Sequence, residues 1–152
     1  MIPSFVDREN ELNFLEERYK SKNFEFFVIY GRRRVGKTEL IKHFLKDKPH
    51  LYLLCDKSGL GRNIARFKKK IADHFGEPII ATSDLEEIFS YLARKEQRLI
   101  VVLDEFSYLV EKDSAVPSMF QVVVDEVLKD TSTFLILCGS SISMMEKAIL
   151  SY

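Results

Sequence analysis

The stretch "IYGRRRVGKTEL", residues 29–40, decides how the rest of this chain is interpreted. An apolar run ends at Gly31, three arginines follow, and then Gly36, Lys37 and Thr38 lead into helix-forming residues. The segment matches the pattern G-x-x-x-x-G-K-[ST], in which successive backbone N–H groups turn inward as an anion-binding nest and the next helix adds its dipole. It therefore predicts a phosphate-binding loop between a buried strand and a helix.

The residue types in this loop have separate expected roles. Lys37 can reach the β- and γ-phosphates of a nucleotide, and the hydroxyl of Thr38 can ligate Mg²⁺. Arg32, Arg33 and Arg34 occupy the free positions of the pattern, where they either contact phosphate or lie in solvent. The predicted nucleotide-binding residues of the loop are Gly31, Arg34, Val35, Gly36, Lys37, Thr38 and Glu39.

Outward from the loop, dense apolar runs alternate with segments of helical period. We expect strands over residues 24–30, 50–56, 98–106 and 133–141, and helices over 7–21, 37–46, 60–75, 83–95 and 117–130, with a last helix starting at Ser143. Ser83 and Glu86 have capping-box spacing, and Pro117 suits a first helical turn. Strands that alternate with helices predict an α/β domain with a parallel sheet.

A second motif supplies acids. In "LIVVLDEF", residues 99–106, an apolar run precedes Asp104 and Glu105. Carboxylates at the carboxyl end of a parallel strand face the crevice where open α/β sheets bind ligands. We expect Asp104 to hold the hydration shell of Mg²⁺ and Glu105 to orient and polarise water for in-line attack.

A hydroxyl is expected to complete the site after the strand "FLILCGSS", residues 134–141. Ser140 is our choice for a group between the attacking water and the γ-phosphate, and Ser141 is the alternative. Both serines could instead cap the helix that follows.

Composition narrows the class of protein. The chain has 152 residues, with 23 basic and 23 acidic side chains, so it has no overall charge bias toward nucleic acid or membrane. No apolar run reaches the roughly 20 residues of a membrane span, and no secretion signal is evident at the amino terminus. Cys55 and Cys138 each end an apolar run and are interpreted as core thiols. We expect a cytoplasmic protein without a membrane association.

Four segments in order carry a family resemblance: "FVDRENEL" from residue 5, "YGRRRVGKTEL" from 30, "LIVVLDEFSYL" from 99 and "FLILCGSSISMMEKAIL" from 134. Together they resemble the archaeal ATPase family, P-loop proteins of the AAA+ and STAND group that also includes origin-recognition-like ATPases. The resemblance implies a P-loop NTPase three-layer sandwich with strand order 5-1-4-3-2. It places Ser140 where the family has its first sensor residue, and it implies that Phe5, Val6 and Arg8 pack beside the adenine ring. From the residues alone, that first segment is only a hydrophobic staple before a charged helix.

The resemblance also implies parts beyond this sequence. Family members continue with an arginine-bearing segment, a helical lid and often further domains, whereas this sequence stops at Tyr152 with four expected strands. We therefore interpret residues 1–152 as a single nucleotide-binding domain, with a base-side segment and helix over 1–23 and the sheet core over 24–152. We expect an amino-terminal fragment whose first strand is an apolar edge open to self-association. An absent arginine finger, worth on the order of 10³–10⁵ in rate, predicts weak or no turnover for this fragment.

Three functions are compatible with the sequence. The leading hypothesis is an ATP-binding and ATP-hydrolysing domain whose nucleotide state drives movement, and the second is a nucleotide-dependent switch with little turnover. The third is a nucleic-acid-associated module, because one helix has a basic side formed by Arg62, Arg66, Lys68, Lys69 and Lys70. The alternative explanation of these residues is an ordinary helix face in contact with solvent. ATP is preferred over GTP because no base motif of the Asn/Thr-Lys-x-Asp type is present. No small-molecule kinase substrate motif is evident.

Overall fold

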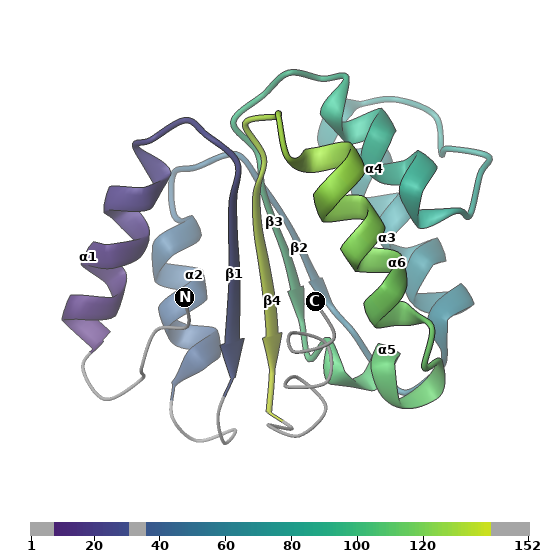
Figure 1. The fold of residues 1–152 in the computed structure, drawn as a ribbon, viewed down its shortest axis with the longest axis horizontal. Helices are drawn as coiled ribbons and strands as arrows, with labels where there is room; N and C mark the ends of the chain where they lie inside the picture. The colour runs from purple at the N-terminus through teal and green to yellow at the C-terminus, as the bar shows by residue number, and fades with distance from the viewer. Residues whose placement is uncertain (1–7, 31–35, 141–152) are drawn as a thin grey trace.

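Four parallel strands form the centre of the fold in the order β1-β4-β3-β2 (Figure 1). The computed structural model describes residues 8–30 and 36–140. The strands are β1 (Glu25–Tyr30), β2 (His50–Leu54), β3 (Ile100–Asp104) and β4 (Phe134–Gly139). The α/β class and the parallel sheet are thus confirmed, and the observed order agrees with the 1-4-3-2 part of the implied order. Within the described residues, β1 lies at one edge of the sheet and β2 at the other.

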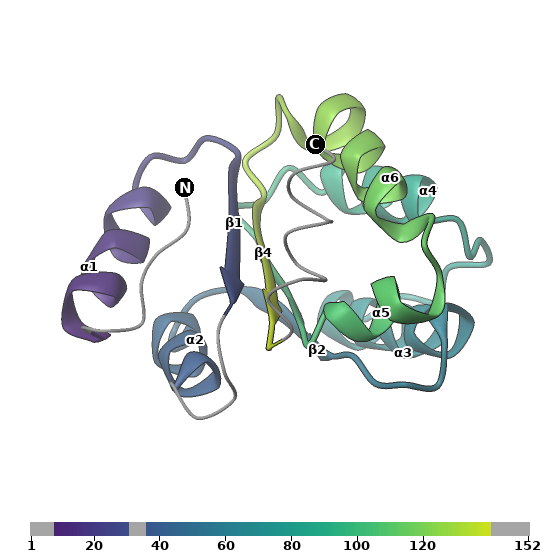
Figure 2. The ribbon, with the colours of Figure 1, turned by 60° about the horizontal axis from the view of Figure 1, so that its bottom comes forward.

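Helices cover both faces of this sheet, which makes three layers (Figure 2). One layer contains α1 (Arg8–Tyr19) and α2 (Lys37–Leu45). The other contains α3 (Leu60–Phe75), α4 (Leu85–Ala93), α5 (Ser107–Lys112), α6 (Val116–Val122) and the π-helix η2 (Val123–Leu128). In the two described ranges, no helix is both long enough and apolar enough to cross a membrane.

The strand residues form two cores because successive side chains on a strand point to opposite faces. In β3, Ile100 and Val102 pack with α1 and α2, whereas Val101 and Leu103 pack with the helices of the other layer. Every residue of β3 and β4 is buried. This is the pattern of parallel strands covered on both faces, and it explains why they read as continuous apolar runs.

Three local features differ from the sequence-based expectations. The helix α5 was not predicted, because its six residues are too few to show a helical period. The helix expected over 117–130 is divided into α6 and η2, with Pro117 in the first turn of α6 as expected. The capping box at Ser83 was wrong: α4 begins after Asp84 without a side-chain cap, and Ser83 accepts a hydrogen bond from Lys68. The helix expected from Ser143 lies outside the described residues.

Arg98, just before β3, ties α1 to the sheet through backbone carbonyl groups. Its Nε and Nη2 donate to the carbonyl of Tyr19 at 3.1 and 3.0 Å, and Nη2 also donates to Arg18 at 3.0 Å. Its Nη1 donates to the carbonyls of Ser132 at 2.7 Å and of Asn23. These carbonyls include two from the last turn of α1, where helix carbonyls lack intrahelical partners. The guanidinium therefore joins the end of α1 to the loops that precede β1 and β4.

Both cysteines are buried and unpaired, as expected of core thiols. Cys55 directly follows β2, and Cys138 lies in β4. Burial raises the pKa of Cys55 to about 12 and raises the pKa of Cys138 well above its ordinary value. Because the thiolate is the reactive form, neither side chain is suited to nucleophilic chemistry at neutral pH.

Replacing Arg98 with Ala should leave several partly buried carbonyls without their charged donor. We expect the free energy of unfolding to fall by about 2–3 kcal/mol, which is a drop in melting temperature of roughly 4–12 °C for a domain of this size. Arg98→Lys should recover only part of the loss, because an ammonium lacks the planar fork. Arg94→Ala, at an exposed position nearby, is the control and should change stability by less than about 0.5 kcal/mol. Equal effects of Arg94→Ala and Arg98→Ala would contradict this account.

The two thiols should resist modification in the folded protein. With a pKa near 12 in place of the ordinary 9.0, the thiolate fraction of Cys55 at pH 8 is roughly a thousandfold smaller. We expect Ellman's reagent to react with both cysteines in guanidinium chloride and with neither in native buffer over the same period. A thiol that reacts at the same rate in both conditions would show that one of these positions is open to solvent.

Candidate functional site

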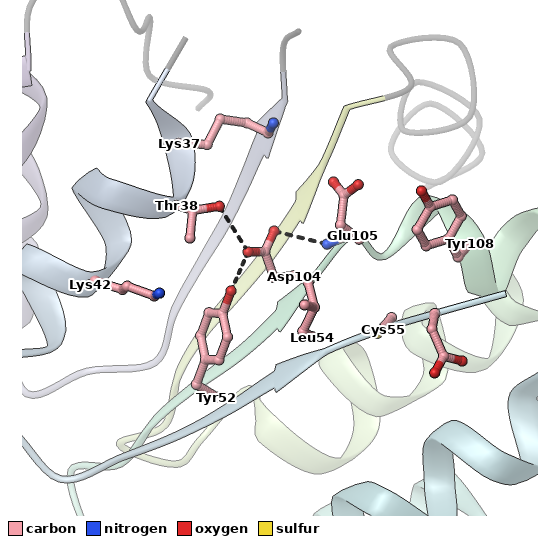
Figure 3. Close-up of a pocket in the computed structure, with 10 residues that line it drawn as sticks. Lys37, Thr38, Lys42, Tyr52, Leu54, Cys55, Asp104, Glu105 and Tyr108 are labelled. Carbon is pink, nitrogen blue, oxygen red and sulfur yellow. Dashed lines mark hydrogen bonds between the residues drawn. The ribbon is translucent and has the colours of Figure 1, made fainter. Parts of the chain in front are cut away.

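The buried carboxylate of Asp104, the last residue of β3, is where the predicted phosphate loop and the predicted acidic motif meet (Figure 3). Asp104 is 2% exposed. The hydroxyl of Thr38, from the first turn of α2, donates to Asp104 Oδ2 at 3.2 Å. The two residues are 66 positions apart in the sequence, and they meet because strand β3 ends beside the start of α2. The structure therefore brings together the two residues that the sequence assigned to Mg²⁺.

The start of α2 is built as a phosphate loop requires. Gly36 has a φ of 80°, in the left-handed region that glycine adopts without strain, and the helix begins at the next residue. Lys37 is 3% exposed, and its side chain lines the same cleft as Thr38. Leu40 completes the first turn by donating its N–H to the carbonyl of Gly36 at 3.0 Å. A lysine at a helix N-terminus inside a cleft is suited to an anionic ligand.

Tyr52, near the middle of β2, also contacts Asp104 and was not singled out from the sequence. Its hydroxyl donates to Asp104 Oδ2, the oxygen that Thr38 also contacts. Burial and the hydrogen bond to Asp104 raise the pKa of Tyr52, so the phenol stays protonated. In a sequence, an aromatic residue within a buried strand is interpreted as a core residue. Only the structure shows that Tyr52 also contacts Asp104.

Glu105 follows Asp104 with an unusual backbone. Its φ is 56°, a left-handed conformation that costs a non-glycine residue about 1–2 kcal/mol. The N–H of Glu105 donates back to Asp104 Oδ1 at 2.9 Å. Ser140, directly after β4, donates its hydroxyl to both carboxylate oxygens of Glu105, at 3.0 and 3.1 Å. The structure thus places the two residues expected to handle water in direct contact.

A cleft of about 550 Å³ opens over these groups. The side chains around it come from α2, from β2 and the loop after it, from the end of β3 and from α5, and include Lys42, Leu54 and Tyr108 besides those already named. Mg²⁺ prefers hard oxygen ligands and usually keeps several waters while it binds one or two protein groups plus substrate phosphate. The hydroxyl of Thr38 and the carboxylate of Asp104 fit this pattern, so the donor set is compatible with Mg²⁺.

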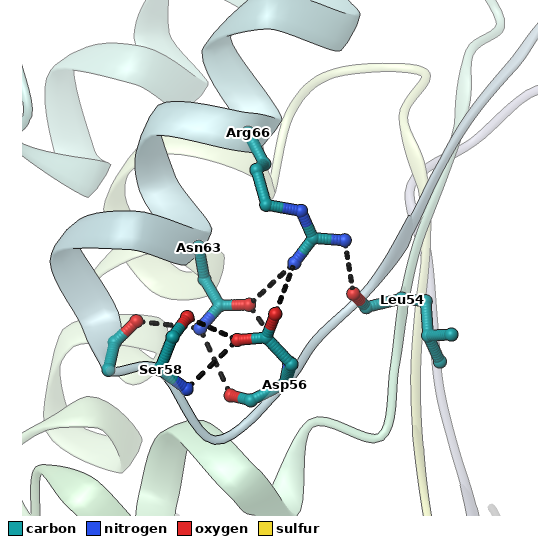
Figure 4. Close-up of polar contacts among 6 residues, drawn as sticks. Leu54, Asp56, Ser58, Asn63 and Arg66 are labelled. Atoms are coloured by element: carbon teal, nitrogen blue, oxygen red, sulfur yellow. Dashed lines mark hydrogen bonds and ion pairs between the residues drawn. The ribbon is translucent and has the colours of Figure 1, made fainter.

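The loop after β2 borders the cleft and is held by polar contacts (Figure 4). Asn63 is 1% exposed and bonds through both ends of its amide, to the N–H and carbonyl of Asp56 and to the carbonyl of Gly59. The guanidinium of Arg66 reaches the carboxylate of Asp56 at 3.3 Å and the carbonyl of Leu54 at 2.7 Å. Of the basic side predicted for this helix, Arg66 and Lys68 therefore bond within the protein, and only the remaining members are exposed.

Several predicted site residues cannot be placed. Phe5, Val6, Gly31, Arg34 and Val35 lie outside the described residues, as do Arg32, Arg33 and Ser141. Arg8 is the first residue of α1. Glu39 lies in the first turn of α2 with an exposed side chain, so only its backbone faces the loop end of the helix. The roles assigned to these residues stay predictions.

Residues 5–152 match the model of a family described as an ATPase domain predominantly from Archaea. Two curated relatives come from Methanocaldococcus jannaschii. An uncharacterised protein is 44% identical over 150 residues, which is 97% of this chain and 32% of the relative. An uncharacterised ATP-binding protein is 51% identical over 47 residues, which is 31% of this chain and 80% of the relative. The chain thus spans about a third of the length of the first relative.

Solved structures show the same fold at low sequence identity. The Walker-type ATPase of Pyrococcus abyssi has a TM-score of 0.67 at 22% identity, over 95% of this chain and 48% of its own. Cdc6p of Pyrobaculum aerophilum has a TM-score of 0.69 at 18% identity, over 96% of this chain and 42% of its own. The ORC2 protein of Aeropyrum pernix has a TM-score of 0.65 at 18% identity, over 97% of this chain and 44% of its own. The chain spans about half the length of these proteins.

Proposed function

The chain belongs to the family of ATPase domains found predominantly in Archaea, and from this premise we propose that it binds ATP with Mg²⁺ and hydrolyses it in the intact protein. Membership in this family identifies an ATP-binding P-loop ATPase domain. The proposal of Mg²⁺ binding and hydrolysis is carried by the hydrogen bond between Thr38 and Asp104, which joins the phosphate loop to the acidic strand end. The carboxylate of Glu105, which lines the same cleft, supports hydrolysis over simple binding.

The phosphate chain of ATP would lie against the start of α2. In this proposal the backbone N–H groups from Gly31 to Gly36 surround the phosphates, and the ammonium of Lys37 reaches the β- and γ-phosphates. The ORC2 protein of Aeropyrum pernix, which has the same fold, was solved in complexes with ADPNP and ADP. On the base side, Phe5, Val6 and Arg8 are proposed to contact adenine.

Mg²⁺ would be held by the oxygens already in contact across the cleft. The hydroxyl of Thr38 donates its proton to Asp104, so its lone pairs stay available to a metal ion, and Asp104 is suited to accept from metal-bound water. When bound, the ion supplies charge neutralisation for the β- and γ-phosphate oxygens. Lys37 contributes a second positive charge from the protein itself.

Glu105 is the proposed general base. Its carboxylate would accept a proton from water as the water oxygen bonds to the γ-phosphorus and the bond from that phosphorus to the β,γ-bridging oxygen breaks, which yields ADP and phosphate. In the structure its two oxygens accept from the hydroxyl of Ser140. Ser140 is proposed to release this bond and face the γ-phosphate when ATP is present.

This same contact favours one second candidate function, a nucleotide-dependent switch with slow turnover. A base whose oxygens are hydrogen-bonded to a serine is occupied until that contact rearranges.

Conformational change, nucleic-acid association and self-association through the edge strand β1 are proposals for the whole protein. Within the described residues, β1 pairs with β4 on one side, and an apolar strand at a sheet edge can pair with another chain.

Melting temperature gives the direct test of ATP binding. At about a hundred times the dissociation constant, Mg²⁺–ATP should add about 2.7 kcal/mol, or roughly 5–11 °C. Lys37→Ala should abolish this shift, whereas Lys46→Ala, exposed at the other end of α2, should keep it. A wild-type protein that is folded and shows no shift would contradict the proposal.

The proposed base is tested by Glu105→Gln. The amide keeps the size of the side chain but accepts no proton, so in the intact protein we expect the rate of phosphate release to fall by about 10²–10⁴ while the melting shift with Mg²⁺–ATP persists. Phosphate release is measured with the wild type and with Glu126→Gln, an exposed position on η2, in parallel. If wild-type release is no faster than that of Glu105→Gln although ATP binds, the switch is the better account.

A further inference from the structure

The strand register explains how Tyr52 reaches Asp104. In the pairing of β2 with β3, Tyr52 lies opposite Val102 and Leu54 lies opposite Asp104, so Tyr52 is a diagonal neighbour of the carboxylate. Leu51 and Leu53 point into the core below α3 and α4, whereas the ring of Tyr52 packs against the core formed with α1 and α2. Packing on that side holds the ring in place, and the hydroxyl of Tyr52 then donates to the carboxylate of Asp104 (Figure 3).

The three described hydrogen bonds to the Asp104 carboxylate are not equivalent. Oδ1 accepts from the N–H of Glu105, and Oδ2 accepts from Thr38 at 3.2 Å and from Tyr52. Thr38 is the group that Mg²⁺ would recruit, and its contact is a long one for a hydroxyl donor. Tyr52 is held within β2 and is not itself a candidate ligand, so its bond to Oδ2 can be kept when the metal is bound.

We infer that Tyr52 is a positioning residue for Mg²⁺, holding the Asp104 carboxylate in the orientation that faces the metal. The inference rests on the proposed function, because it assigns a partner to the same site. Groups that hydrogen-bond to metal-binding carboxylates typically change metal affinity by about 10–100-fold when they are removed.

Tyr52→Phe separates positioning from packing, since it removes the hydroxyl and keeps the ring. The matched control is Tyr91→Phe. Its hydroxyl also donates to a carboxylate, that of Glu77, between α3 and α4 and away from the cleft. A fluorescent ATP analogue is titrated into each protein with EDTA and then at increasing Mg²⁺, and folding is checked by melting temperature.

For Tyr52→Phe we expect the half-saturating Mg²⁺ concentration to rise about 10–100-fold, with the affinity in EDTA within about twofold of wild type. Tyr91→Phe should match wild type in both readouts. A half-saturating concentration unchanged in Tyr52→Phe overturns the inference and leaves ATP binding intact. An equal loss of affinity with and without Mg²⁺ also overturns it, because the ring contact would then be the cause. A wild type that binds no analogue overturns the proposed function and this inference together.

A measurement on the wild type covers the case in which Tyr52→Phe does not fold. A phenol held on a carboxylate exchanges its proton slowly, so proton NMR should show one protected tyrosine hydroxyl assigned to Tyr52. Rapid exchange of that proton would overturn the inference.

Discussion

The fold around the cleft depends on one constraint, the burial of the Asp104 carboxylate at the end of β3. A charge that is 2% exposed is tolerated only when its oxygens accept hydrogen bonds. The donors come from α2, from β2 and from the next peptide of its own strand. The hydrogen bonds to this one carboxylate therefore hold α2 and β2 against the end of β3. The phosphate loop leads directly into that helix, so the geometry of the loop end depends on an acid far away in the sequence.

The site divides into two parts with different chemistry. On one side of Asp104 are the ammonium of Lys37 and the hydroxyl of Thr38, which suit phosphate and metal. On the other side Glu105 and Ser140 contact each other and suit water. The two parts share a peptide bond, because Asp104 and Glu105 are consecutive. The backbone of Glu105 is left-handed and therefore strained. With this conformation, the consecutive carboxylates of Asp104 and Glu105 contact different partners.

Much of this arrangement could be predicted, because its signals are local. The loop pattern with Lys37 and Thr38 has a defined spacing, and Asp104 with Glu105 ends an apolar run at the edge where parallel strands converge. Tyr52 could not be recognised in this way, because its contact with Asp104 comes from the register of β2 against β3 and that register has no signature in either strand. The helix α5 was missed for a different reason, its shortness. The capping box at Ser83 failed because the serine was taken by Lys68 on a neighbouring helix, a contact that local spacing cannot reveal.

The strand order has a consequence for the way the molecule must assemble. β4 lies between β1 and β3, and in the pairing of β1 with β4, Glu25 is opposite Phe134, at the far end of the described sequence. Among the described strands β1 pairs only with β4, so it can join them only after β4 has been synthesised. Contacts between such distant segments require a large loop-closure entropy and slow the folding of a domain. Phe134, Ile136 and Cys138 of β4 belong to the core under α1 and α2, so this core is incomplete until β4 is inserted. The core that supports α2 beneath the cleft is therefore completed only when the four described strands are together.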